Sequence, residues 1–150
     1  DHYNELVIDL VNPAGQPERM QLVVRGYNDG FAFCYKIPDG KGPCVNVQSE
    51  LTAYNFAGDY TAWFYNGENH NIGPEKLTET DGTRLPVMTV KAGDKHYMAI
   101  HEACLETGAP LVLQSKGGNR SFRSLPSRPV CRRDIHQPGV SFCMGRHLAC

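Results

Sequence analysis

Residues 20–37 read MQLVVRGYNDGFAFCYKI, and this stretch decides the fold class. It holds two runs of apolar and aromatic residues on either side of Asn28–Gly30. An Asp-Gly pair tolerates the positive φ angles of tight hairpin turns, so the two runs are expected to pair as antiparallel strands. In the second run, Phe31, Phe33 and Tyr35 occupy alternate positions and therefore share one face of the strand.

The same pattern continues on both sides of this hairpin. Runs of β-forming residues recur about every 8–12 residues between turn residues, as in a sandwich. Residues 66–83 are polar and are expected to form a long surface loop. No segment shows helical periodicity, so the sequence predicts an all-β fold, an antiparallel β-sandwich. Besides the hairpin, strands are predicted at residues 6–10, 45–47, 51–56, 60–65, 86–90, 96–100 and 111–113.

The strand pattern stops after Gln114. Residues 115–119, SKGGN, are expected to be a flexible link. Residues 121–150 lack alternation and are expected to be irregular. The sequence therefore predicts a β-sandwich domain over residues 1–115 and an irregular tail over residues 116–150.

Charge is divided unevenly between these two parts. Residues 1–119 hold 9 Lys and Arg against 15 Asp and Glu, a net charge of −6, and residues 120–150 hold six Arg against Asp134, a net charge of +5. The basic tail could bind an acidic partner, fold back on the acidic body, or be foreign to the domain. It lacks interleaved aromatic residues, and an acidic body repels phosphate, which argues against nucleic acid. No run of 18 apolar residues exists and no signal peptide is visible, so no membrane span is expected.

Three of the six cysteines, Cys131, Cys143 and Cys150, lie in the tail. An even number permits disulfides in an oxidising compartment, with 15 possible pairings. Together with His136 and His147 these cysteines are also candidate zinc ligands. Structural zinc sites usually begin with a C-x₂₋₄-C pair, which is absent here, so the spacing argues against zinc.

Four motifs resemble one enzyme family. RGYNDGFAF at residues 25–33 resembles a hairpin motif of family 97 glycoside hydrolases, and NFAGDYTAW at residues 55–63 resembles their F-x-G-D-Y-T-A-W. Residues 86–90 match the next strand, and AIHEA at residues 99–103 resembles x-I-H-E-A-A-L. The resemblance covers roughly residues 3–115 and identifies the chain as part of the N-terminal β-sandwich of such an enzyme, a partial super-sandwich.

This resemblance carries implications for function. The family contains exo-acting α-glucosidases and α-galactosidases, in which the sandwich precedes a (β/α)₈ barrel that carries the catalytic carboxylates. A calcium ion lies near the sugar, and the resemblance makes Glu102 one of its ligands. It also implies a periplasmic or secreted location in a bacterium. The chain is expected to lack the earliest strands of the sandwich and the barrel, and it no longer resembles the family from Ser121.

Two kinds of side chain are candidates for work on sugars. Trp63 and Tyr65 share one face of a predicted strand and Phe64 lies on the other, so the first two could stack on pyranose rings, although one face must belong to the core. Glycoside hydrolysis usually needs two carboxyl groups, for which Glu102 and Glu106 are the candidates. Neither stands out as an acid.

Three functional hypotheses follow. The chain is a carbohydrate-associated module without a complete catalytic site. Alternatively, it is a small glycoside hydrolase whose carboxylates meet within the fragment or at an oligomer interface, formed through exposed strand edges. The third hypothesis is an interaction protein that uses the basic tail.

Overall fold

The computed structural model describes residues 2–13, 19–36, 51–67, 70–103, 110–126 and 140–145. Every regular element among them is a β-strand, and all pairings are antiparallel, so the predicted all-β class is confirmed. No helix in this part of the chain could cross a membrane. In chain order the strands are β1 (Asn4–Val11), β2 (Arg19–Gly26), β3 (Phe31–Lys36), β4 (Ala53–Asn55), β5 (Thr61–Tyr65), β6 (Asn71–Lys76), β7 (Asp81–Lys91), β8 (Tyr97–Ile100), β9 (Leu111–Lys116), β10 (Ser121–Pro126) and β11 (Val140–Gly145).

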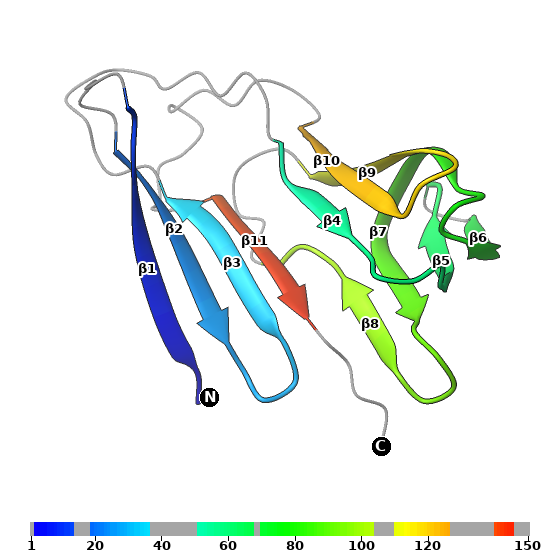
Figure 1. The fold of residues 1–150 in the computed structure, drawn as a ribbon, viewed down its shortest axis with the longest axis horizontal. Helices are drawn as coiled ribbons and strands as arrows, with labels where there is room; N and C mark the ends of the chain where they lie inside the picture. The colour runs from blue at the N-terminus through cyan, green and yellow to red at the C-terminus, as the bar shows by residue number, and fades with distance from the viewer. Residues whose placement is uncertain are drawn as a thin grey trace.

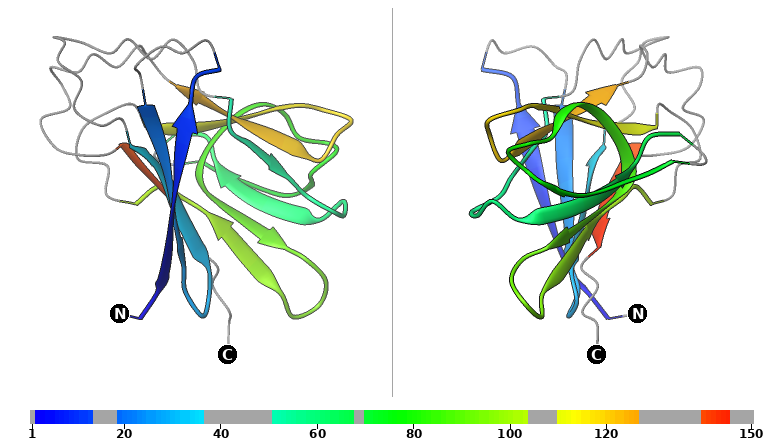
Figure 2. Two further views of the ribbon diagram at one scale, coloured as in Figure 1. Left: turned by 60° about the vertical axis from the view of Figure 1, so that its left-hand side comes forward. Right: turned by 90° about the vertical axis from the view of Figure 1, so that its right-hand side faces the viewer.

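The strands form two layers that share β7. The larger layer runs in the order β1-β2-β3-β11-β8-β7 and continues through β5 to β6. The first residues of β7 pair with β9, which pairs with β10 and then β4 to give the smaller layer. Because β7 serves both sheets, the smaller layer lies beside one half of the larger one (Figures 1 and 2). This is the predicted antiparallel sandwich.

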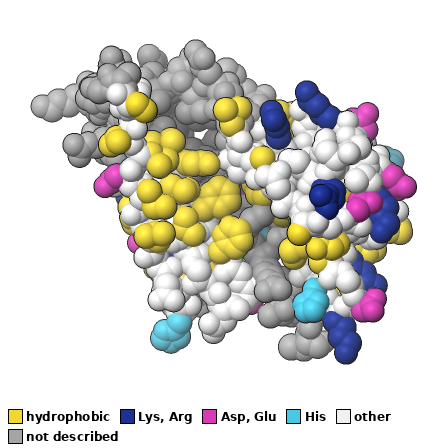
Figure 3. Space-filling view, viewed as in Figure 1, with side chains coloured by type: hydrophobic (Ala, Val, Ile, Leu, Met, Phe, Trp, Pro, Cys, Tyr) yellow, Lys and Arg dark blue, Asp and Glu magenta, His cyan; other side chains and the backbone are white. Residues whose placement is uncertain are grey.

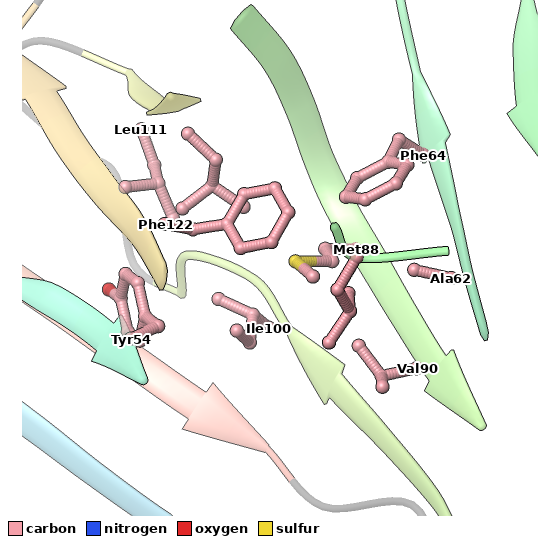
Figure 4. Close-up of a cluster of buried hydrophobic side chains, with 10 residues drawn as sticks. Tyr54, Ala62, Phe64, Met88, Val90, Ile100, Leu111 and Phe122 are labelled. Carbon is pink, nitrogen blue, oxygen red and sulfur yellow. The ribbon is translucent and has the colours of Figure 1, made fainter. Parts of the chain in front are cut away.

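The core lies between the smaller layer and that half of the larger one. Alternate residues of each strand point inward, as the two-residue period of a strand requires. The ring of Phe122 lies 5.7 Å from that of Phe64 across the two layers (Figure 4). The buried apolar residues come from both sheets and from the turn after β6: Tyr54, Ala62, Phe64, Leu77, Met88, Val90, Ile100, Leu111, Leu113 and Phe122.

The other half of the larger layer has the same alternation, but no described strand lies over it. Leu6 is opposite Val24, and Val24 is opposite Phe33, so the three share a face, and Leu6 is 58% exposed. Figure 3 shows hydrophobic side chains gathered over this half. We name it the β1–β3 face, and its apolar members are Leu6, Ile8, Leu10, Met20, Leu22, Val24, Phe31, Phe33 and Tyr35.

Both predicted hairpins are confirmed. The N–H of Tyr27 donates to the carbonyl of Gly30 at 2.8 Å, closing the turn between β2 and β3. In the second hairpin, between β7 and β8, the N–H of Ala92 donates to the carbonyl of His96 at 2.8 Å. Gly93 takes the positive φ of 88° that this turn needs. The strand expected at residues 45–47 lies outside the described residues.

The long loop expected over residues 66–83 is wrong for much of its length. Residues 71–76 form β6, and β7 already begins at Asp81. The sequence of β6 is NIGPEK, and its Gly and Pro are typical of loops. Among the described strands β6 pairs only with β5, and an edge position tolerates Pro74 because no partner needs its missing N–H.

The irregular structure expected after Gln114 is also wrong for residues 115–126 and 140–145, whereas the rest of the tail lies outside the described residues. Residues 117 and 118 form a tight turn with φ near 63° at both glycines, and their N–H groups donate to the carbonyls of Thr80 and Thr78. Residues 121–126 then form β10, and residues 140–145 form β11 between β3 and β8. A division of the chain after residue 115 stays a prediction, although the pairing of β10 favours a later boundary.

Candidate functional site

The aromatic pair Trp63 and Tyr65 lies on the outer face of β5. Phe64 and Ala62 point into the core and are fully buried, whereas Tyr65 is 42% exposed and Trp63 is half-buried. The face that the core uses is therefore that of Phe64. Trp63 and Tyr65 are left toward solvent on the opposite side of the sheet.

Trp63 is held in place by the strand beside it. A β-carbon at Gly73 of β6 would lie 3.0 Å from the Cα and 3.1 Å from the Cδ1 of Trp63, so only glycine lets β6 approach the indole this closely. Gly73 also has a φ of +116°, which favours glycine. On the other side, Thr89 of β7 lies opposite Trp63, and Lys91 lies opposite Thr61. The outer face thus places an oriented aromatic side chain among hydroxyl and amine groups.

Glu102 follows β8, and its side chain forms hydrogen bonds with the first residue of β9. Both of its carboxylate oxygens lie 3.1 Å from the backbone N–H of Leu111, the first residue of β9. Leu111 is buried, so this N–H depends on the carboxylate for its hydrogen bond. The Nδ1 atom of His101 lies 3.0 Å from the carbonyl oxygen of Glu102. Glu102 therefore joins the end of one layer to the start of the other.

These residues do not make a complete calcium site. Calcium takes six to eight oxygen ligands, and no group of three or more His, Cys, Asp or Glu side chains gathers in the part of the chain that the structure describes. Glu102 could offer one carboxylate ligand of such a set. The predicted partner carboxylate Glu106 lies outside the described residues.

The predicted disulfide or zinc residues cannot be placed either. Cys131 and Cys150 lie outside the described residues, as do His136 and His147, and the side chain of Cys143 is not described although its backbone belongs to β11. Cys34, on the outer face of β3, carries a free thiol.

Asp59, in the motif at residues 55–63, has a structural task that sequence reasoning missed. Its two carboxylate oxygens accept hydrogen bonds from the backbone N–H and the hydroxyl of Thr78, at 3.1 and 3.0 Å. The hydrogen bond from the Thr78 backbone, followed by that from its hydroxyl and by the charges of Lys76 and Arg120, lowers the pKa of Asp59. Asp59 thereby fastens the connection between β4 and β5 to the turn after β6.

A second polar cluster lies at the end of the core. Oε1 of Glu75 accepts hydrogen bonds from Nε and Nη2 of Arg84, both at 3.2 Å, and from the hydroxyl of Thr80 at 3.1 Å. The guanidinium of Arg84 lies 5.8 Å from the ring centre of Phe64. Glu75 sits in the segment expected to be a loop, so no sequence signal pointed to this cluster.

The sequence and the fold together match one family. The model of the glycosyl-hydrolase 97 N-terminal family matches residues 1–131. The chain belongs to this family. The match extends beyond residue 115, where the resemblance was expected to end, and it includes β10.

Two relatives contain a segment similar to this glycosyl-hydrolase 97 N-terminal chain. This chain is 31% identical over 124 residues to a probable retaining α-galactosidase of Streptomyces bingchenggensis. It is 29% identical over 138 residues to a retaining α-galactosidase of Bacteroides thetaiotaomicron. The alignments cover 81% and 80% of the chain, but only 16% and 20% of the relatives. The chain therefore spans a small part of the length of these enzymes.

Proposed function

We propose that this chain is a carbohydrate-associated β-sandwich module of a glycoside hydrolase and does not itself contain a complete catalytic site. The observation that carries the proposal is the outward position of Trp63 and Tyr65, because the core is filled without them. Aromatic faces bury well against apolar surfaces of a ligand, and an oriented ring loses little conformational entropy on binding.

The surroundings of the aromatic pair suit a sugar. Thr61, Thr89 and Lys91 lie on the same outer face as Trp63 and can exchange hydrogen bonds with ring hydroxyls. The pair Trp63 and Tyr65 lies on the outer surface of a sheet, with Tyr65 42% exposed and Trp63 half-buried. We therefore expect weak binding, with dissociation constants of about 1 mM or weaker.

The carboxylates support a module rather than an enzyme. Hydrolysis needs an acid and a second carboxylate on either side of one bond. Glu102 uses both oxygens to hold the start of β9. In the longer enzyme it would supply at most one calcium ligand, with the other oxygens coming from elsewhere. A periplasmic or secreted location belongs to the same proposal and rests on the family alone.

Binding is tested by NMR titration of the chain with methyl α-galactoside and, separately, methyl α-glucoside. The two relatives are named as α-galactosidases, so the galactoside is the first ligand to test. Trp63→Ala and Tyr65→Ala should each weaken binding at least about tenfold. Tyr3→Ala is the matched control, because Tyr3 is 44% exposed on β1's side of the sheet, far along the strand order from β5. Equal weakening in all three variants would argue against the platform.

Catalysis is tested with nitrophenyl α-galactoside. The chain should show no turnover above the uncatalysed rate. Turnover that disappears in Glu102→Gln would establish the alternative, a small glycoside hydrolase, and would overturn the module.

A further inference from the structure

The connection between β5 and β6 starts with Asn66 and Gly67, and no other Asn of the sequence is followed by Gly. The two strands lie at the end of the larger layer that is remote from β1 (Figure 1). Asn66 is exposed, and its backbone N–H donates to the carbonyl of His70 at 3.0 Å. The pairing of β5 with β6 ends at Tyr65 and Asn71. The backbone nitrogen of Gly67 therefore lies beyond the ladder of the two strands.

The backbone nitrogen of Gly67 is not crowded. A β-carbon at this residue would meet no described atom within 4 Å beyond its chain neighbours. The φ of +95° favours glycine here, and glycine has no β-carbon of its own to shield the nitrogen. The side chain of Asn66, which belongs to the preceding residue, can therefore reach this nitrogen.

We propose that Asn66 is a deamidation site, at which the folded chain converts itself slowly to aspartate and isoaspartate without an enzyme. The backbone nitrogen of Gly67 attacks Cγ of Asn66, a bond forms between these atoms, and the side-chain amide nitrogen leaves as ammonia with the proton that Gly67 loses. Water then opens the resulting succinimide. Addition of water at Cγ gives aspartate, and addition at the backbone carbonyl carbon of residue 66 gives isoaspartate. Water is the only co-reactant, and nothing is oxidised or reduced.

Asn119 shows the opposite arrangement in the turn between β9 and β10. Its Oδ1 accepts a hydrogen bond from the N–H of Ser121 at 2.9 Å, and its Nδ2 donates to the carbonyl of Gly117 at 3.1 Å. Two local hydrogen bonds thus hold the side-chain amide in place. The next residue is Arg120, whose β-carbon shields the backbone nitrogen that would have to attack. Asn119 is therefore expected to keep its amide.

Asn71 is a second comparison, within the same hairpin. It is exposed like Asn66, but it is the first residue of β6 and lies opposite Tyr65 in the ladder. The β-branched side chain of Ile72 follows it and crowds the backbone nitrogen. Exposure alone therefore does not select Asn66. The glycine that follows it and the place beyond the ladder do.

Conversion changes the end of β5. Either product replaces a neutral amide with a carboxylate directly after Tyr65. Isoaspartate also routes the main chain through Cβ and Cγ of residue 66, which lengthens the connection beside the hydrogen bond to His70. This chemistry proceeds whether or not Trp63 and Tyr65 bind a sugar.

Peptide mapping by mass spectrometry tests the proposal, on the chain incubated for days in mildly alkaline buffer below its melting transition. Asn66 should lose its amide at least about tenfold faster than Asn71 and Asn119 in the same sample. Part of the product should be isoaspartate, which an isoaspartate-specific methyltransferase labels. Gly67→Ala should slow the loss by about tenfold or more. The added methyl shields the nitrogen in the folded and the unfolded chain alike, so this comparison does not depend on how well the variant folds.

Three results would overturn the inference. The first is a chain in which Asn66 stays intact while a synthetic peptide with the sequence of residues 62–71 is converted at this position, because the fold would then protect the site. The second is an equal rate of loss at Asn66, Asn71 and Asn119. The third is an unchanged rate in Gly67→Ala, or a product that contains aspartate alone, which would point to direct hydrolysis instead of attack by the backbone.

Discussion

Replacing Phe122 with alanine tests whether the strand after residue 115 belongs to the fold. Phe122 is fully buried, and its ring lies 5.7 Å from that of Phe64 and 6.2 Å from that of Phe56. Truncation of a buried phenylalanine costs about 3–5 kcal/mol, which includes the cavity left behind. That is a large part of the roughly 5–15 kcal/mol by which domains are stable. For a domain of this size it lowers the melting temperature by about 6–20 °C.

The assay is thermal unfolding followed by circular dichroism, in reducing buffer so that disulfides do not contribute. Phe122→Leu retains part of the side-chain volume, so its melting temperature should fall between those of the wild type and the alanine variant. Arg123→Ala is the control, because Arg123 is the next residue of β10 and is exposed. The free energy of unfolding of Arg123→Ala should stay within about 0.5 kcal/mol of the wild-type value. A Phe122→Ala variant that melts with the wild type would refute the packing of β10 and support a domain that ends near residue 115.

Three further predictions concern polar side chains. The pKa of Asp59 is lowered in the folded chain, so its stabilisation is present above the ordinary value of 3.8 and is lost as the pH falls through the folded pKa; Asp59→Asn should flatten this part of the acid dependence in urea titrations. Glu75→Gln should lower the free energy of unfolding by about 1–3 kcal/mol in the same titrations, because the charged hydrogen bonds of Glu75 are partly buried. Glu5→Gln, in an exposed pair, should lower the free energy of unfolding much less than Glu75→Gln does, and equal losses would contradict the role of burial. Glu102→Ala should cost about 1–3 kcal/mol by leaving the buried N–H of Leu111 unpaired, whereas a loss as large in Glu102→Gln would show that accepting this hydrogen bond is not what matters.

Local signals in the sequence were sufficient to predict the two hairpins and to predict which side chains of β5 share a face. An Asp-Gly turn and a two-residue alternation are properties of adjacent residues, so they survive in any tertiary context. The same alternation placed Trp63 and Tyr65 opposite Phe64. Which of the two faces is the core could not be known, because that depends on the smaller layer.

The errors arise where distant segments decide the local structure. β6 contains Gly73 and Pro74 and becomes a strand because β5 lies beside it. β10 is short, and its Arg123 conceals the alternation of Phe122 and Ser124 toward the core. The sequence makes Glu102 a candidate metal ligand or acid, but its carboxylate accepts a hydrogen bond from Leu111, nine residues further along the chain. No pattern within a short window contains that information.

The way the smaller layer is assembled has a consequence for folding. β4 pairs with β10, so residues 53–55 cannot pair until residues 121–123 are present, and three of the ten buried apolar residues, Leu111, Leu113 and Phe122, also come from this last part of the fold. Until those residues are synthesised, the inner faces of β5, β7 and β8 lack the side chains that β9 and β10 contribute to the core. Such distant pairing makes folding slow, in the range of about milliseconds to seconds. A nascent chain that stalls near residue 115 would expose both an unpaired β4 and an uncovered core, the state in which β proteins aggregate or recruit chaperones.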